Sequence, residues 1–351
     1  MILGRQNKKC RELLNRIIIS ETNKLKNEIE QDISLNKTVS IFSIPKQPDT
    51  EINYFTDYNK LKIIFFKLNN KKSSSFDGIS GIQLKRLPNK TKWYYTVLFN
   101  NALNNTYFPT KWKKDKLPAI TKKKKKKKKN KDGSSPSNLR PISLLPNISK
   151  VFEIVINNLL VSFYTKNHII PENQFGFRHK NSTLHAINKL TLGIYWALNA
   201  KQEVAACLTN LEKAFGTVWI LGLIYKVNKK NIPNYLIKIF RYMIINKYFV
   251  ITDGSHTSCK EFFIEYGLRQ EIVNSFLLFN IYNSDLLNLV NLNTSAHTRS
   301  IAFADDLVIY VIGCKTKIVG TKCQKLFEKI NDFNHTWKLQ INAKPYSLDP
   351  N

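Results

Sequence analysis

Two adjacent carboxylates, Asp305 and Asp306, lie between apolar runs in the segment IAFADDLVIY, residues 301–310. Side-by-side negative charges in apolar surroundings repel each other and are costly unless a positive partner meets them. Because successive side chains of a strand point to opposite faces, two neighbours can serve one site only at a turn. We therefore expect either a site that holds a positive partner or an ordinary turn with two solvated aspartates.

The elements that must position this pair can be read from the surrounding residues. Residues 300–303 and 307–312 are short β-branched and aromatic runs, typical of the two strands of one hairpin. Four further segments carry strand or helix patterns: a strand over 203–211, a helix over 212–219, a helix over 322–339 and a strand over 340–348. Strands and helices that do not alternate regularly predict an α+β fold.

The chain before residue 140 reads as a linker, a helical region and a charged loop. Residues 1–53 predict a basic helical linker. Helical patterns over 54–112 are interrupted by one turn at 73–80, SSSFDGIS. Residues 121–137 contain a lysine run and no apolar residue to bury, so we expect a solvated loop. This loop either attracts phosphates or simply reflects adenine-rich coding sequence.

The formal net charge of +30 at pH 7 is extreme for 351 residues. Without the eight lysines Lys122–Lys129 the chain would still carry 30 − 8 = +22, so the basic character is spread along the chain. Such a field favours a polyanionic partner, with nucleic acid first and an anionic membrane surface second. Most of the basic residues are lysines, which suit phosphate groups better than base edges.

Other residue types exclude several classes of protein. Five scattered cysteines without a Cys-x-x-Cys pair predict neither a disulfide framework nor a zinc site. No apolar stretch is long enough to span a bilayer and the N-terminus lacks a signal-peptide core, so we expect no membrane partner. An intracellular location, in the nucleus or cytoplasm, follows. Trp112, Trp219 and Trp337 are expected in the core rather than at a base-stacking surface.

Several blocks along the chain resemble those of one family. They include SFDGIS at 75–80, NLRPISLLPNISKVFE at 138–153, QFGFRHKNST at 174–183, LEKAFGTVW at 211–219, LLFNIYNSDL at 277–286, FADD at 303–306 and WKLQIN at 337–342. In this order, they resemble the reverse transcriptase domain of jockey-like non-LTR (LINE) retrotransposons. The resemblance implies a right-hand polymerase fold over 54–351, with fingers and palm, and with the thumb largely absent because the chain ends at Asn351.

The resemblance implies that Asp305 and Asp306 bind two Mg²⁺ ions, which promote transfer of deoxynucleotides to a DNA primer on an RNA template. A third carboxylate belongs to the family pattern Asp-x-x-x-Ala-Phe-Asp, but this chain has Asn210 at the first position and Gly216 at the last. An amide oxygen can touch Mg²⁺ but brings no negative charge. Glu212 is not a substitute, since glutamate is ordinary there in the family. The catalytic set Asp305, Asp306 and Asn210 therefore lacks one acidic ligand.

A second departure from the family lies at residues 267–276. There the family has Pro-Gln-Gly-Ser near the start and Ser-Pro near the end. This chain keeps Gln270 as a nucleotide contact, but has Arg269, Glu271 and Phe276 in place of the proline, the glycine and the later proline. Glutamate in place of glycine adds bulk and negative charge next to the expected nucleotide, which opposes binding.

Further residues match family positions that contact the nucleotide or template. Phe215 matches the bulky side chain next to the sugar 2′ position; the alternative is a core aromatic on an amphipathic helix. Arg140, Lys150 and Arg178 resemble residues of the fingers that meet the triphosphate or template, and the alternative is ordinary solvated charge. Lys344 resembles a lysine of the last palm strand, with a shifted spacing.

Three functions remain open. The first is an RNA-directed DNA polymerase whose activity is impaired or lost in a truncated, partly degenerate copy. The second is a non-catalytic, nucleic-acid-binding remnant of such a polymerase. The third is a basic nucleic-acid-binding or chaperone protein that uses the fold structurally. The changes at Asn210, Gly216, Glu271 and Phe276 favour loss of activity, and Asp to Asn, Asp to Gly and Gly to Glu each need only one base change.

Overall fold

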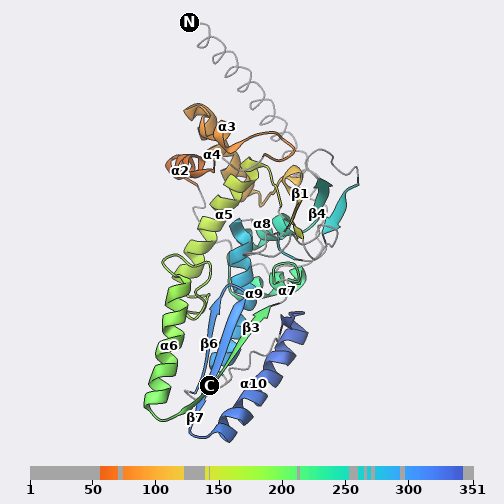
Figure 1. The fold of residues 1–351 in the computed structure, drawn as a ribbon. Coiled ribbons are helices and arrows are strands. Elements are labelled where there is room, and N and C mark those ends of the chain that lie inside the picture. The colour runs from red at the N-terminus through yellow and green to blue at the C-terminus, as the bar shows by residue number, and fades with distance from the viewer. Residues whose placement is uncertain are drawn as a thin grey trace. The chain divides into compact units, whose positions relative to one another are not determined.

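The computed structural model describes residues 56–69, 74–121, 139–141, 143–211, 214–252, 260–264, 267–269, 273–292 and 297–342 (Figure 1). The predicted linker over 1–53 and residues 122–137 of the lysine-rich loop lie outside this description, as do Gln270, Glu271 and Lys344. Helices and strands follow one another without regular alternation, so the predicted α+β class is confirmed. The chain divides into two compact units, one of residues 1–159 and 233–264 and one of residues 160–232 and 265–351.

The first unit combines helices with a four-stranded sheet. Its elements are α2 (Tyr58–Lys67), α3 (Gly81–Lys85), α4 (Asn89–Asn104), the 3-10 helix η2 (Thr110–Lys113), β1 (Lys114–Thr121), β2 (Leu139–Pro141), the first part of α5 (Asn147–Lys166), α8 (Asn234–Ile244), β4 (Lys247–Thr252) and β5 (Phe262–Ile264). The strand order is β2-β1-β4-β5, with β1 parallel to β4. The turn predicted at 73–80 is present in the described residues 74–80, with Gly78 at φ +66°.

Aromatic residues form the core of the first unit. The rings of Phe99 and Phe152 lie 4.8 Å apart, and Trp112 contacts Phe152 at 5.6 Å between centroids. Only 4% of Trp112 is exposed, which confirms its predicted place in the core.

The second unit is built around an antiparallel sheet in the order β6-β7-β3-β8. Its elements are the end of α5, α6 (Thr183–Asn199), β3 (Glu203–Leu211), α7 (Ile220–Lys229), α9 (Val273–Leu292), β6 (Thr298–Phe303), β7 (Asp306–Gly313), α10 (Thr316–Thr336) and β8 (Ile341–Asn342). The strands predicted over 203–211, 300–303 and 307–312 and the helix predicted over 322–339 are thus confirmed, apart from their ends.

Alternation along these strands gives the sheet two buried faces, with α6 on one side and α10 on the other (Figure 1). On one face, Ala302 and Ile309 pack with residues of α9 and α10. On the other face, Ile301 and Tyr310 pack with Ala186 of α6. Because both faces are covered, the register of the β6–β7 hairpin is strongly specified.

The helix predicted over 212–219 is wrong in the residues that the structure describes. Residues 214–217 form a turn, and α7 begins only at Ile220. The carbonyl oxygens of Phe215 and Val218 accept hydrogen bonds from the backbone N–H groups of Leu268 and Gly267, at 2.6 and 3.0 Å. These bonds go to another loop instead of along a helix, and Gly216 is a weak helix former. Phe215 is therefore not a helical residue.

Candidate active site

The two predicted catalytic aspartates lie at the turn between β6 and β7. Phe303 pairs with Asp306, so Ala304 and Asp305 form a two-residue turn. Asp305 is half-buried, whereas Asp306, the first residue of β7, is exposed. The predicted hairpin is confirmed, with Asp305 in its two-residue turn and Asp306 directly after the turn. Ala304 has φ +61°, a conformation that costs a non-glycine residue about 1 kcal/mol or more, so other contacts must hold the turn.

A loop that precedes α6 supplies those contacts. The buried Gln174 side chain accepts hydrogen bonds through Oε1 from the N–H of Ala304 at 3.1 Å and from the N–H of Gly176 at 2.9 Å. Its Nε2 donates to the carbonyl of Ala304 at 3.3 Å. The backbone N–H of Ala302 donates to the carbonyl of Asn173 at 2.9 Å, and that of Phe175 donates to the carbonyl of Ala302 at 2.8 Å. The loop therefore fixes both strand and turn.

Glycine is required at position 176. A Cβ atom there would lie 2.0 Å from the backbone nitrogen of Ala304, which no real contact permits. The carbonyl of Gly176 accepts a hydrogen bond from Asn280 of α9 at 3.0 Å. Gln174, Gly176 and Asn280 were not predicted as site residues from the sequence. They lie in blocks that carry the family resemblance, but nothing local indicates that they meet a turn far along the chain.

The third predicted catalytic position is adjacent to the second. Antiparallel pairing aligns Asn210 of β3 with Asp306 of β7 on one side and with Asn342 of β8 on the other. The N–H of Leu211 donates to the carbonyl of Asp305 at 3.3 Å. Directly opposed residues of antiparallel strands have Cβ atoms about 5 Å apart. The backbone thus brings positions 210, 305 and 306 together, with an amide where a third carboxylate was expected.

The electrostatics of the turn favour a cation. Burial raises the pKa of the Asp305 carboxyl, and the charge of Asp306 raises it further. Two carboxylates could hold a divalent cation, which would offset this repulsion. Within the described residues, no group of three or more histidine, cysteine, aspartate or glutamate side chains could hold a metal. The donor set therefore fits a cation only in part.

An aromatic cluster lies next to the hairpin turn in the fold. The Phe215 ring is 5.0 Å from Phe279, 5.6 Å from Phe276 and 6.2 Å from Phe177 between centroids. Phe276 stacks on Phe177 at 4.0 Å. Phe215 is half-buried, so three rings pack around the side chain that was predicted to face the sugar. Its role toward a nucleotide stays a prediction.

The other predicted nucleotide contacts are dispersed between the two units. Arg140 on β2 and Lys150 on α5 belong to the first unit. Arg178 belongs to the second unit, where its Nη1 donates to the carbonyls of Pro171 at 3.1 Å and Gln174 at 3.3 Å. Arg178 thus anchors the loop that holds the turn. The nucleotide roles of all three residues stay predictions.

A buried lysine supports the β8 edge of the site. Lys226 is 1% exposed; its Nζ donates to the carbonyl of Tyr282 at 2.7 Å and lies 3.4 Å from Asp285 Oδ2. The Nζ also lies 3.9 Å from the ring centroid of Trp337, which ends α10 shortly before β8. Tyr282 donates to the carbonyl of Trp337. Burial lowers the pKa of Lys226 to about 8. Trp337 and Trp219 are half-buried.

Among the described residues, Cys207, Cys314 and Cys323 are free thiols. Across the described part of the chain, no helix has both the length and the apolar character needed to cross a membrane.

Comparison with known proteins identifies the family. The family model of reverse transcriptase (RNA-dependent DNA polymerase) matches residues 122–345. The chain is 29% identical over 277 residues to the probable RNA-directed DNA polymerase from transposon BS of Drosophila melanogaster, covering 78% of this chain and 30% of that protein. It is also 29% identical over 300 residues to the corresponding X-element protein of the same species, covering 85% of this chain and 32% of that protein.

A third relative is the RNA-directed DNA polymerase from the mobile element jockey of Drosophila funebris, 27% identical over 286 residues. That match covers 81% of this chain and 30% of the relative, so the chain spans about a third of the length of these relatives. The resemblance to jockey-like non-LTR elements is confirmed. Because the family model covers more than half of its residues, the chain belongs to the reverse transcriptase (RNA-dependent DNA polymerase) family.

Proposed function

We propose that the Asp305–Asp306 turn is the centre of an RNA-directed DNA polymerase site whose activity is strongly impaired. In this proposal the second unit is the palm and the first unit belongs to the fingers. The substrates are an RNA template, a DNA primer and deoxynucleotides, and the protein works inside the cell. Family membership and the net charge of +30 support these partners.

One observation carries the proposal. The strand register sets Asn210 opposite Asp306, directly beside the turn that contains Asp305. Two carboxylates and a third donor position on adjoining strands form an arrangement suited to divalent cations. Mg²⁺, when bound, would supply the positive charge that stabilises the transferring phosphoryl group. Asp305 and Asp306 would hold it, and the loop around Gln174 would keep their backbone in place.

Impairment follows from the side chain at position 210. An amide brings no negative charge, so cations at the turn would be held by two carboxylates instead of three. Electrostatic stabilisation dominates phosphoryl transfer, and loss of such a contribution lowers rates by roughly a hundredfold or more. Phe276 adds a second obstacle, because its ring packs against Phe215 where the sugar would have to fit.

Primer extension on an RNA template with Mg²⁺ and deoxynucleotides tests the proposal. We expect little or no extension by the natural chain, and a gain in Asn210→Asp or in Asn210→Asp combined with Phe276→Pro. Asp305→Ala should abolish any extension that the other variants show. Robust extension by the natural chain that survives Asp305→Ala would show that the turn is not the catalytic centre.

The second candidate function is a nucleic-acid-binding remnant without catalysis. The amide at Asn210 favours it, since binding of a polyanion needs the positive surface but not the third carboxylate. A remnant would bind RNA and DNA with an affinity that falls steeply with salt, and Asn210→Asp would not yield extension. An affinity that is indifferent to salt would contradict this function.

A further inference from the structure

Helix α6 carries a row of apolar side chains on its solvent-exposed side. Its opposite side packs against the β6–β7 hairpin through Ala186. The exposed row, which we call the α6 stripe, consists of Leu184 (62% exposed), Ile187 (55%), Thr191, Tyr195 (58%) and Leu198 (58%). Because a helix turns by about 100° per residue, these five positions lie within a sector of about 80°. Leu192, 56% exposed, borders the stripe.

The apolar area of this row is large for an exposed helix. With about 200 Å² for a large side chain, the four large members of the stripe and Leu192 expose roughly 600 Å² per chain. Contiguous apolar patches of this size on a protein surface mark interaction sites. Two such faces would together bury about 1,200 Å², at the lower end of specific protein–protein interfaces. The area therefore fits a weak dimer.

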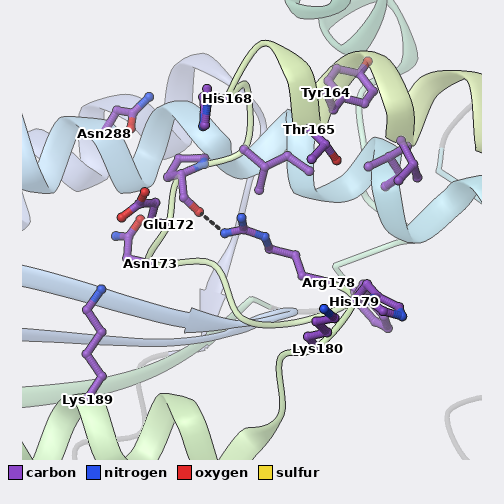
Figure 2. A pocket seen from close by; sticks show the side chains of 15 residues that line it. Tyr164, Thr165, His168, Glu172, Asn173, Arg178, His179, Lys180, Lys189 and Asn288 are labelled. Carbon is purple, nitrogen blue, oxygen red and sulfur yellow. Dashed lines mark hydrogen bonds between the residues drawn. The ribbon is translucent and has the colours of Figure 1, made fainter.

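The charge of α6 argues against a polyanionic partner. The helix contains one lysine and no arginine, aspartate or glutamate, whereas 23% of the whole chain is charged. That lysine, Lys189, lines a cavity of about 870 Å³ (Figure 2) and projects about 160° away from Thr191 around the helix axis. Nucleic acid and anionic membranes both require cations beside the contact. The stripe therefore suits an apolar protein surface.

The spacing within the stripe favours a second copy of the same helix. Neighbouring members are three, four, four and three residues apart, so the row reads the same in both directions from Thr191. In an antiparallel pair with a two-fold axis at Thr191, Leu184 meets Leu198 of the second copy. Ile187 likewise meets Tyr195. The Thr191 Oγ1 already donates to backbone carbonyls of its own helix at 3.1 Å, so the helices can approach there without an unpaired hydroxyl.

We infer that the chain forms a homodimer in which the α6 stripes of two copies pack antiparallel about Thr191. Each copy contributes the same surface, so the arrangement is closed. The net charge of +30 opposes association, and the contact forms where the helix carries least charge. Salt should therefore strengthen this dimer by screening the repulsion, whereas salt weakens any association that nucleic acid mediates. The dimer is independent of the proposed polymerase function.

Paired charges test the antiparallel contact. Leu184→Glu/Leu198→Lys places opposite charges at both ends of the helix pair, whereas Leu184→Lys/Leu198→Lys and Leu184→Glu/Leu198→Glu place like charges there. Within one helix these positions are about 21 Å apart, so their charges meet only between copies. Sedimentation equilibrium of the nuclease-treated full chain, from about 1 to 200 µM in about 0.15 M salt, gives the dissociation constants.

We expect the natural chain to dimerise in the micromolar range, and more tightly as salt is raised. The opposite-charge variant should dimerise at least about tenfold more tightly than both like-charge variants. No difference between the opposite-charge and the like-charge variants would overturn the inference. A natural chain that stays monomeric up to about 200 µM, or that associates only before nuclease treatment, would also overturn it.

Polar substitutions test whether the stripe is the contact surface. Leu184→Gln/Ile187→Gln should weaken the dimer at least about tenfold. Ile63→Gln/Phe66→Gln, at positions of α2 that are 54% and 77% exposed and equally spaced, is the matched control and should leave it unchanged. Equal weakening by both would contradict the contact. Thermal unfolding checks that each variant is folded. The assay contains no nucleic acid or Mg²⁺, so dimerisation and primer extension can succeed or fail separately.

Discussion

The two sides of the candidate active site differ in how closely their residues match the family pattern. On the hairpin side, formed by the β6–β7 turn and residues 173–177, both carboxylates are present and the backbone groups of the turn bind the Gln174 side chain. On the β3 side, formed by β3 and residues 214–217, the strand register is kept, but Asn210 and Gly216 replace the expected aspartates.

This difference separates the backbone arrangement of the site from the side chains that would bind a cation. Main-chain pairing sets the position of residue 210 and does not depend on whether its side chain is an amide or a carboxylate. Changes on the hairpin side should therefore act on folding, and changes on the β3 side should act on cation binding with little effect on folding.

Gly176→Ala should have the largest effect, because the added Cβ would meet the backbone nitrogen of Ala304 at 2.0 Å. We expect a loss of about 4 kcal/mol in the free energy of unfolding, measured by urea denaturation. Gly320→Ala is the matched control. It lies in α10 with nothing within 4 Å of the added Cβ, so the same change should stabilise the chain by about 0.5–1 kcal/mol. Equal effects of the two changes would contradict the close approach of Gly176 to the backbone of the turn.

The buried Lys226, near the β8 edge, should make the free energy of unfolding depend on pH. Its pKa is about 8 in the folded chain against 10.5 for an ordinary lysine, so the unfolded chain binds the proton more tightly. The free energy of unfolding should therefore rise with pH between about 8 and 10.5, by about 3 kcal/mol. Lys226→Met should lack this rise. Urea denaturation of both proteins at pH 7.5 and 10.5, at about equal salt concentration, measures this rise in the free energy of unfolding. An equal rise in the natural chain and in Lys226→Met would contradict the prediction.

Gln174→Ala would leave the buried N–H groups of Ala304 and Gly176 without their acceptor. We expect a loss of about 2 kcal/mol in the free energy of unfolding. Gln324→Ala, on the exposed surface of α10, removes one bond of 3.4 Å and should cost under about 0.5 kcal/mol. If thermal or urea unfolding shows the two variants to be alike, the Gln174 side chain does not hold the turn.

Asn210→Asp should have the smallest effect on folding. Without divalent cations, a third carboxylate opposite Asp306 should lower the free energy of unfolding by about 1 kcal/mol. Addition of Mg²⁺ should reverse this loss. Asn331→Asp, at an exposed position of α10, is the control and should show no such reversal. A loss that Mg²⁺ leaves unchanged would indicate that position 210 does not share a cation with the turn.

The strands that form the site could be predicted from the sequence, but the contacts that hold the hairpin turn in place could not. β3 and the β6–β7 hairpin could be predicted because their β-branched and aromatic runs are interrupted only at the turn. The contacts of Gln174, Gly176 and Asn280 could not be predicted, because they join residues more than 100 positions apart in the sequence.

The predicted helix after β3 failed for a related reason. Its apolar spacing fits a helix, but the carbonyls of Phe215 and Val218 bind Leu268 and Gly267, which tertiary structure brings close. Local patterns carry no information about such partners. The Lys226 contacts were missed because one lysine among many gives no sign of burial.

Divalent-cation binding tests most directly whether positions 210, 305 and 306 form one incomplete site. Mn²⁺, as a reporter for Mg²⁺, can be titrated into the natural chain, Asn210→Asp and Asn210→Asp/Asp305→Ala, with bound metal measured by electron paramagnetic resonance. We predict that Asn210→Asp binds at least about tenfold more tightly than the natural chain, and that Asp305→Ala removes this gain. Equal affinity of the natural chain and Asn210→Asp would contradict the account.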